Sequence, residues 1–308
     1  MTHDENDPPS LESHGPPEPR DPLAQQEPAE PSIDAAFEPI ESDPPPGITL
    51  PWIAPALPDD LRVPWGWRDL LLLVGVAAIG TVVIQLILVA VLALRGIPLS
   101  RLQNNSDGVA LLAAIAAQVV IDFALLGYMA AQIRFWYHRP FWWTIGWRPI
   151  KTEKYPPAIA YMGLAFGGFI LVAIVSLASS AFPPGHPLPI ENIFQYRPAV
   201  LMYMFAAVFV APLVEEILFR GYLYPVVART FGIGGGIAIV GTLFGLLHSV
   251  QLWGGWWQIA LLVFVGVVLT AVRAGSGTLV ASYIVHLIYN SVQVVAFLFA
   301  TQGGRHLP

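Results

Sequence analysis

The chain has no cysteine among its 308 residues, and only 12% of its residues are charged. The absence of cysteine excludes disulfide bonds and thiolate metal ligands. So few charges, together with 55% hydrophobic residues and a mean hydropathy of +0.61, are untypical of an ordinary soluble protein. The beginning of the chain also lacks a basic region followed by an apolar core, so we expect no cleavable signal peptide. The composition therefore indicates a protein with several membrane-spanning segments.

The few charges that are present are divided sharply along the chain. Residues 1–64 contain 14 Asp and Glu but only two Arg, a balance of −12, whereas residues 65–308 contain seven acids and 13 Lys and Arg, a balance of +6. The first stretch is also rich in Pro and Ser, and such a segment cannot bury enough apolar surface to offset the entropy of ordering it. We therefore expect a disordered, solvated acidic tail over residues 1–64 and a membrane domain over residues 65–308. Docking of the tail on a basic partner is the alternative role.

Apolar segments recur through the membrane domain, each about as long as a helix needs to cross a ~30 Å hydrocarbon core. We predict an all-α, polytopic membrane protein with about seven transmembrane helices, within a range of six to eight. The last three segments follow one another closely, which leaves room for one that is tilted, broken or re-entrant. The predicted spans cover residues 70–94, 109–133, 158–181, 199–227, 233–252, 256–272 and 279–300.

The longest loop between these spans is basic. By the positive-inside rule such a loop lies in the cytoplasm. Counting spans outward from it, we expect a cytoplasmic N-terminus. No sequence feature indicates a eukaryotic source, so we expect the inner membrane of a bacterium. The basic residues of this loop are Arg134, Arg139, Arg148, Lys151 and Lys154.

The fourth predicted span contains three charged residues, Glu215, Glu216 and Arg220. Translocon scales put roughly 2.5–3.5 kcal/mol on each charge at the bilayer centre, so such residues usually pair with one another or line a functional cavity. Glu216 and Arg220 stand four residues apart, which places them on one helical face, acid first. Glu215 is rotated about 100° away from them. Pro212 removes a backbone donor just upstream and predicts a kink there.

Two later spans carry further motif pairs with the same four-residue spacing, each of which includes a histidine. Phe244 and His248 lie in the fifth span, and His286 and Asn290 lie in the last. A lone histidine in an apolar helix is more often bonded to a neighbouring helix than catalytic. Six polar groups gathered in the last third of a chain that is otherwise poor in them favour one shared, hydrated pocket between helices.

Asp122 is the other acid expected within the membrane. It follows Gln118 by four residues in the second span. A hydrogen bond to a neighbouring polar side chain explains it better than a role in proton relay, and we place it outside the site.

The residue types indicate a hydrolytic reaction. A carboxylate in an apolar site is suited to take a proton from water, and a nearby imidazole can share that work. A His/Asn pair can supply hydrogen-bond donors to an oxyanion. The chain has no Gly-x-Ser-x-Gly nucleophile elbow, which leaves water activated by glutamate or by a metal. Glu215, His248 and His286 could hold zinc with one position open. The spacing does not decide between zinc and no cofactor.

The three motifs together resemble the CAAX-protease and bacteriocin-processing family of intramembrane peptidases, also called the CPBP or Abi family. They follow one another in the family's order, and the resemblance covers about residues 199–298. They stand in this sequence as Glu215-Glu216-x-x-x-Arg220, Phe244-x-x-x-His248 and His286-x-x-x-Asn290.

The resemblance implies a CAAX prenyl protease-like endopeptidase that cuts a peptide bond near the membrane. By motif position it implies that Glu215 activates water and that His248 assists it. It further implies an oxyanion site at His286 and Asn290. The remaining motif residues, Glu216, Arg220 and Phe244, would support the site.

We therefore expect an intramembrane endopeptidase whose pocket opens toward the cytoplasmic half of the bilayer. Its expected partners are membrane lipid and a peptide or membrane-protein substrate, and no nucleic acid. A non-catalytic scaffold or bacteriocin-immunity protein of the same fold is the first alternative. A proton-coupled transporter using Glu215, Glu216 and Asp122 is the second, and the lack of an internal repeat speaks against it.

Overall fold

The fold is known from a computed structural model, which describes residues 58–98, 100, 107–182 and 188–301. All regular secondary structure in these residues is helical, as predicted. The chain divides into two compact units, and everything below concerns the second, residues 56–308. Most of the expected acidic tail, residues 1–57, lies outside the described residues.

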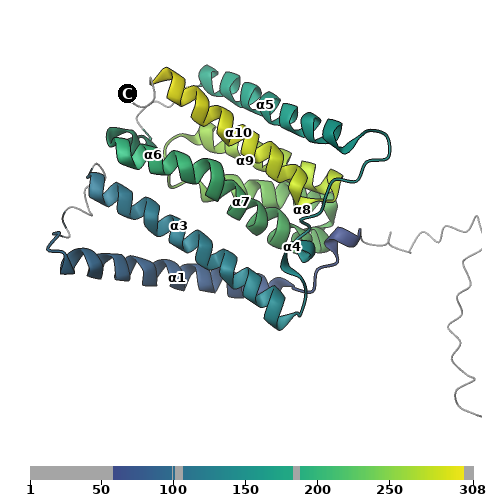
Figure 1. The fold of residues 1–308 in the computed structure, drawn as a ribbon, viewed down its shortest axis with the longest axis horizontal. Coiled ribbons are helices and arrows are strands. Elements are labelled where there is room, and N and C mark those ends of the chain that lie inside the picture. The colour runs from purple at the N-terminus through teal and green to yellow at the C-terminus, as the bar shows by residue number, and fades with distance from the viewer. Residues whose placement is uncertain (1–57, 99, 101–106, 183–187, 302–308) are drawn as a thin grey trace, which may run out of the picture. The chain divides into compact units, whose positions relative to one another are not determined.

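The helices follow the predicted apolar segments closely. Figure 1 shows α1 beside α3 on one side of α6 and α7, and α10 beside α5 on the other. The long elements are α1 (Trp67–Leu94), α3 (Gly108–Ala131), α5 (Pro157–Ala181), α8 (Tyr224–Leu247), α9 (Trp256–Ser276) and α10 (Leu279–Ala300). The shorter ones are η2 (Asp59–Leu61), the π-helical η3 (Gln132–Trp136), α4 (Phe141–Thr144), η4 (Pro189–Gln195), α6 (Arg197–Phe205), the π-helical η5 (Ala206–Val210), α7 (Ala211–Glu215) and the π-helical η6 (Glu216–Leu223).

Six of the described helices are long and apolar enough to cross a membrane, and the protein is an integral membrane protein. The fourth of these, Arg197–Leu247, has 51 residues. A straight helix of that length would measure about 76 Å, far more than a bilayer core. The chain reverses within it at Gly232, where φ is 76° and ψ is 168°. The reversal divides the fourth helix into the fourth and fifth predicted spans, the fifth of which ends at Leu247 rather than at residue 252.

The reversal at Gly232 folds the two arms into an antiparallel hairpin. Residues equally distant from the turn face each other: a Cβ atom added to Gly236 would lie 2.9 Å from the Cβ of Ala228. Further along, the guanidinium carbon of Arg220 lies 4.4 Å from the centre of the Phe244 ring. This register brings the end of the second arm level with the acidic motif, so the first two motifs meet in space because of one glycine turn.

Helix α9 packs against the second arm at very short range. A Cβ atom at Gly241 would lie 2.6 Å from the backbone nitrogen of Val267, and one at Gly245 would lie 2.5 Å from that of Val263. From the other side, a Cβ atom at Gly266 would collide with the Gly241 carbonyl oxygen. Glycines of this kind let helix backbones approach closely, which supplies packing where lipid offers no hydrophobic drive between helices.

The segment that precedes α1 is packed against the helices. Leu61 and Trp65 are each only 1% exposed. The Trp65 ring stacks on Tyr222 at 4.8 Å, and its Nε1 donates to the Tyr222 carbonyl oxygen at 2.9 Å. Arg229 donates to the carbonyl oxygens of Val63 and Trp65. We expected the tail to reach residue 64, but the packed region already includes Leu61.

We predicted a kink at Pro212, and the structure has an irregular helical turn just upstream of it. Pro212 stands in the first turn of α7 and cannot donate to the preceding turn. Residues Ala206–Val210 instead form a π-helical turn. A second π-helical stretch, Glu216–Leu223, begins in the acidic motif itself. Irregular turns of this kind within α-helices are frequent at functional sites.

Replacement of Gly232 by alanine should destabilise the protein. The backbone conformation of Gly232 is nearly restricted to glycine, and forcing another residue into it costs about 1–3 kcal/mol. We expect Gly232→Ala to lower the melting temperature of the purified protein in detergent by several degrees. Gly234→Ala is the matched control, since it has open space around it and no positive φ. Equal melting temperatures for the two variants would contradict the hairpin geometry.

Candidate active site

The innermost group of the site is Glu216, whose side chain is 0% exposed. One carboxylate oxygen, Oε1, accepts hydrogen bonds from two different helices. Arg220 Nη1 lies 3.0 Å from it, and His286 Nδ1 of α10 also lies 3.0 Å from it. A carboxylate buried in an apolar environment is very unfavourable unless it is paired and hydrogen-bonded. Glu216 therefore ties the fourth helix to α10.

Arg220 is equally buried and is held on every side. Its Nε donates to Thr270 Oγ1 at 3.3 Å, and its Nη2 donates to the Gly266 carbonyl oxygen at 3.1 Å. Thr270 in turn donates to the same carbonyl at 2.7 Å. The guanidinium also lies over the Phe244 ring, where a cation–π contact adds to the hydrogen bonds. Arg220 thus connects the motif to α9 and to the second arm of the hairpin.

Glu215 differs from its neighbour in both exposure and partners. Its side chain is 23% exposed. Its two oxygens face the two histidines: His248 Nε2 lies 3.8 Å from Oε1, and His286 Nε2 lies 3.7 Å from Oε2. These distances are too long for direct hydrogen bonds. The structure therefore brings three predicted site residues together around a carboxylate that still has room for another group.

The hydrogen bonds on the far side of each imidazole define its tautomer. His248 Nδ1 lies 2.8 Å from the Phe244 carbonyl oxygen, and His286 Nδ1 lies 3.0 Å from the Glu216 carboxylate. Both partners can only accept, so in each ring Nδ1 carries the hydrogen. In a neutral ring Nε2 is then an acceptor. Two imidazole nitrogens and the Glu215 carboxylate consequently present lone pairs to the same small region, an arrangement that suits a molecule with hydrogens to donate.

His248 lies at the end of its helix and not within it. It directly follows Leu247, the last residue of α8, and its side chain is 24% exposed. The Phe244 ring, which is buried, contacts both imidazoles, with centroid distances of 5.0 Å to His248 and 5.7 Å to His286. Phe244 therefore acts as the packing surface between the two histidines.

Asn290 bonds to the fourth helix upstream of the acidic motif. Its Nδ2 donates to the carbonyl oxygen of Ala207 at 2.8 Å. Ala207 belongs to the π-helical turn η5, where the regular backbone hydrogen bonds are disturbed. Asn290 thus anchors α10 to the irregular part of the fourth helix, a contact that the motif alone did not predict.

Asp122 has the hydrogen bond that the spacing predicted. Gln118 Nε2 donates to Asp122 Oδ1 at 2.8 Å on the same helix, α3. Asp122 and Tyr203 both lie within electrostatic range of Glu215. Neither forms a direct contact with the carboxylate among the described interactions, so Asp122 stays outside the site.

The three side chains that could hold zinc, Glu215, His248 and His286, do not form a ready ligand set. In the part of the chain that the structure describes, no group of three or more His, Asp or Glu side chains is arranged to hold a metal ion. Zinc binds nitrogen and oxygen at about 2.0–2.2 Å in a tetrahedron, which puts neighbouring ligand atoms roughly 3.3 Å apart. The imidazole nitrogens lie 3.7 and 3.8 Å from the Glu215 oxygens, so the three groups would have to close further around a metal.

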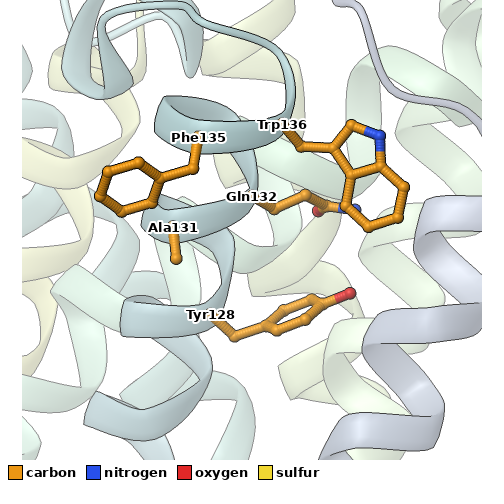
Figure 2. Close-up of a pocket in the computed structure, with 5 residues that line it drawn as sticks. All are labelled: Tyr128, Ala131, Gln132, Phe135 and Trp136. Atoms are coloured by element: carbon orange, nitrogen blue, oxygen red, sulfur yellow. The ribbon is translucent and has the colours of Figure 1, made fainter.

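A separate groove lies on the surface at the end of α3 and involves none of the motif residues. Its volume is about 510 Å³. Figure 2 shows the rings of Tyr128 and Trp136 on either side of the Gln132 side chain, with Phe135 and Ala131 toward the other flank. Gln132 Nε2 and the Tyr137 hydroxyl both donate to Asp69 Oδ1 at 2.8 Å. Through these two hydrogen bonds Gln132 and Tyr137 join the end of α3 to Asp69 at the start of α1.

Loss of Arg220 should be far more harmful than simultaneous loss of Arg220 and the Glu216 charge. Removing one partner of a buried ion pair leaves an uncompensated charge and costs about 3–5 kcal/mol. We expect Arg220→Met to destabilise the purified protein by this amount in thermal or denaturant unfolding. Arg220→Met/Glu216→Gln should recover a large part of the loss. A double variant that loses the sum of the two single effects would show that the pair is not coupled.

Comparison with known proteins agrees with the resemblance that the three motifs indicated. No curated protein and no solved structure matches the chain. A family model described as Type II CAAX prenyl endopeptidase Rce1-like matches residues 197–292. The matched stretch begins at α6, contains all the motif residues and ends within α10. Residues 197–292 of this integral membrane protein are therefore similar to the Rce1-like endopeptidases over the stretch that contains the three motifs.

Proposed function

We propose that the protein is an intramembrane endopeptidase in which Glu215 activates the attacking water. The observation that carries this proposal is the contrast between two adjacent glutamates. Glu216 is sealed by Arg220 and His286, whereas Glu215 is partly exposed and faces two imidazole nitrogens at 3.7–3.8 Å. The family match over this stretch supports the reaction class.

In the proposed reaction a water molecule donates its hydrogens to Glu215 and to Nε2 of His248. Its oxygen attacks the carbonyl carbon of the peptide while Glu215 takes one proton. Glu215 then delivers that proton to the amide nitrogen, and the C–N bond breaks. The new carboxyl group and the free amine leave the site. This sequence balances in atoms and charge with Glu215 returned to its starting form.

The negative charge that develops on the carbonyl oxygen requires a donor. We propose that His286 fills this role, because the hydrogen bond between its Nδ1 and the buried Glu216 carboxylate fixes the ring and its Nε2 lies toward Glu215. Asn290, which the motif pattern placed beside His286 in this role, instead positions α10 through Ala207. Arg220, Thr270 and Phe244 position the two acidic and two imidazole groups without contacting the substrate.

The proposed substrate is a peptide segment of a membrane-associated protein. Placement of the protein in a bacterial inner membrane, with a cytoplasmic N-terminus and a site open to the cytoplasmic half, remains our proposal from the positive-inside pattern. Prenylated C-terminal tails are not expected in that setting, so the proposal covers the reaction and not the prenyl group.

The source of the activated water can be tested separately. If Glu215 activates the water without a metal, treatment with the metal chelator 1,10-phenanthroline should leave peptide cleavage unchanged. Activity that is lost on chelation and restored by zinc would replace the glutamate route with metal-bound water held by Glu215, His248 and His286.

Glu215→Gln should abolish cleavage without unfolding the protein. General base catalysis by a positioned side chain contributes typically 10²–10⁴-fold, and we expect a loss of that size in liposomes supplied with a library of membrane peptides and read by mass spectrometry. His248→Ala should lose a similar factor. The melting temperature of Glu215→Gln should stay near that of the wild type, because this side chain is partly exposed and lacks a close partner.

Asp122→Asn serves as the matched control, since it removes an intramembrane carboxylate outside the site. It should cleave at the wild-type rate. Equal cleavage by wild type and Glu215→Gln would overturn the proposal and favour a scaffold or immunity role. Proton flux that depends on Asp122 would instead favour a transporter.

A further inference from the structure

A polar pocket of about 540 Å³ lies away from the active site. It forms where the segment before α1, the region around α4 and the first arm of the hairpin meet. The pocket is rich in arginine. Its charged lining residues are Asp59, Asp60, Arg62, Arg139, Arg148 and Arg229.

Both aspartates of the pocket are already paired. Asp59 Oδ1 lies 3.4 Å from Arg62 Nη1. Asp60 Oδ2 lies 2.6 Å from Nη1 of Arg273, a fully buried arginine of α9 behind the pocket. The two negative charges are therefore compensated and leave nothing for the remaining arginines.

Three lining arginines have no carboxylate partner among the residues that the structure describes. Arg229 donates only to backbone carbonyl oxygens, those of Val63 and Trp65. Within residues 58–98, 107–182 and 188–301, no carboxylate forms an ion pair with Arg139, Arg148 or Arg229. The pocket consequently concentrates positive charge, which favours an anionic occupant.

Buried donors in and behind the pocket also lack partners. Nε of Arg148 is buried without a hydrogen bond, and so are Nε and Nη2 of Arg273. Buried guanidinium donors are rarely left unsatisfied, and Arg148, which lines the pocket, could be served there by an anion with several acceptor oxygens.

Aromatic residues place the pocket at the membrane surface. The Arg148 guanidinium lies 4.5 Å from the centre of the Trp143 ring, and Trp143 is 55% exposed. Trp142 beside it is 49% exposed. Tryptophans at the ends of apolar helices sit at the level of lipid headgroups. An anion in this pocket would thus lie where phospholipids carry their phosphates.

We propose that this pocket binds the phosphate of an anionic phospholipid. Arg139 and Arg148 contact the phosphate oxygens, and Trp143 packs against the glycerol backbone. Basic pockets between transmembrane helices bind anionic headgroups in this way. Because the pocket is built from three separate segments, the bound lipid joins the start of the chain to the α4 region and the hairpin.

The test measures lipid binding to the purified full chain by native mass spectrometry, with phosphatidylglycerol and phosphatidylcholine added in equal amounts. We expect phosphatidylglycerol to bind preferentially. Arg139→Gln/Arg148→Gln should weaken its binding about tenfold or more, because two charge-assisted contacts are lost. Arg134→Gln/Lys154→Gln is the matched control, since it removes two exposed charges from the same basic loop but outside the pocket. The control should bind phosphatidylglycerol like the wild type.

Three results would overturn the proposal. One is equal binding of the two lipids, and another is equal loss in the pocket and control variants, which would reduce the effect to general surface charge. The third is displacement of phosphatidylglycerol by millimolar inorganic phosphate, which would make free phosphate the ligand. If the double variant does not fold, phosphatidylglycerol binding by the single variant Arg139→Gln tests the proposal. Arg139 is exposed, so this substitution should leave the fold intact.

Discussion

The buried carboxylate of Glu216 is the constraint on which the rest of the site depends. It lies in an apolar helix with no access to water, and its charge is tolerable only because Arg220 and His286 both bond to one of its oxygens. Arg220 in turn is held by α9 and by the Phe244 ring. One charge thus determines how four helical elements must sit around it.

From this constraint follows the difference between the two glutamates. Successive residues on a helix point about 100° apart, so only one member of a Glu-Glu pair can enter the sealed network. Glu216 does so, and Glu215 is left at the edge of the network with both imidazole Nε2 atoms toward it. A π-helical turn begins at Glu216, and another lies upstream of the motif, so the helix is irregular around both glutamates. The sealed group holds the geometry, and the open group is free to react.

Much of this arrangement could be predicted from residue pattern. The last helix spans Leu279–Ala300 as expected, because its apolar run is bounded by a Thr cap and a left-handed glycine turn before it. The pairing of Glu216 with Arg220 was also predicted, since spacing along one helix is a local property. Gly232 falls between the fourth and fifth predicted spans, but the sequence did not show that the chain reverses there. The reversal depends on contacts between the two arms of the hairpin.

What escaped prediction depends on contacts between helices. Thr270 and Gly266 bind Arg220, but a threonine and a glycine in an apolar helix carry no signal of that. The role of Asn290 at the oxyanion stays a prediction, and its hydrogen bond to the Ala207 carbonyl oxygen in a π-helical turn was not predicted, because sequence does not reveal such turns. The packing of Leu61 before the first span was missed because the surrounding residues share the composition of the acidic tail.

The most direct test of the account is an experimental structure of the full chain in lipid nanodiscs, determined by electron cryomicroscopy. The account requires density for both imidazoles beside Glu215, with each Nε2 within about 4 Å of the carboxylate, near the 3.7 and 3.8 Å found here. A map in which either imidazole faces lipid, or in which Glu215 rather than Glu216 is paired with Arg220, would contradict it.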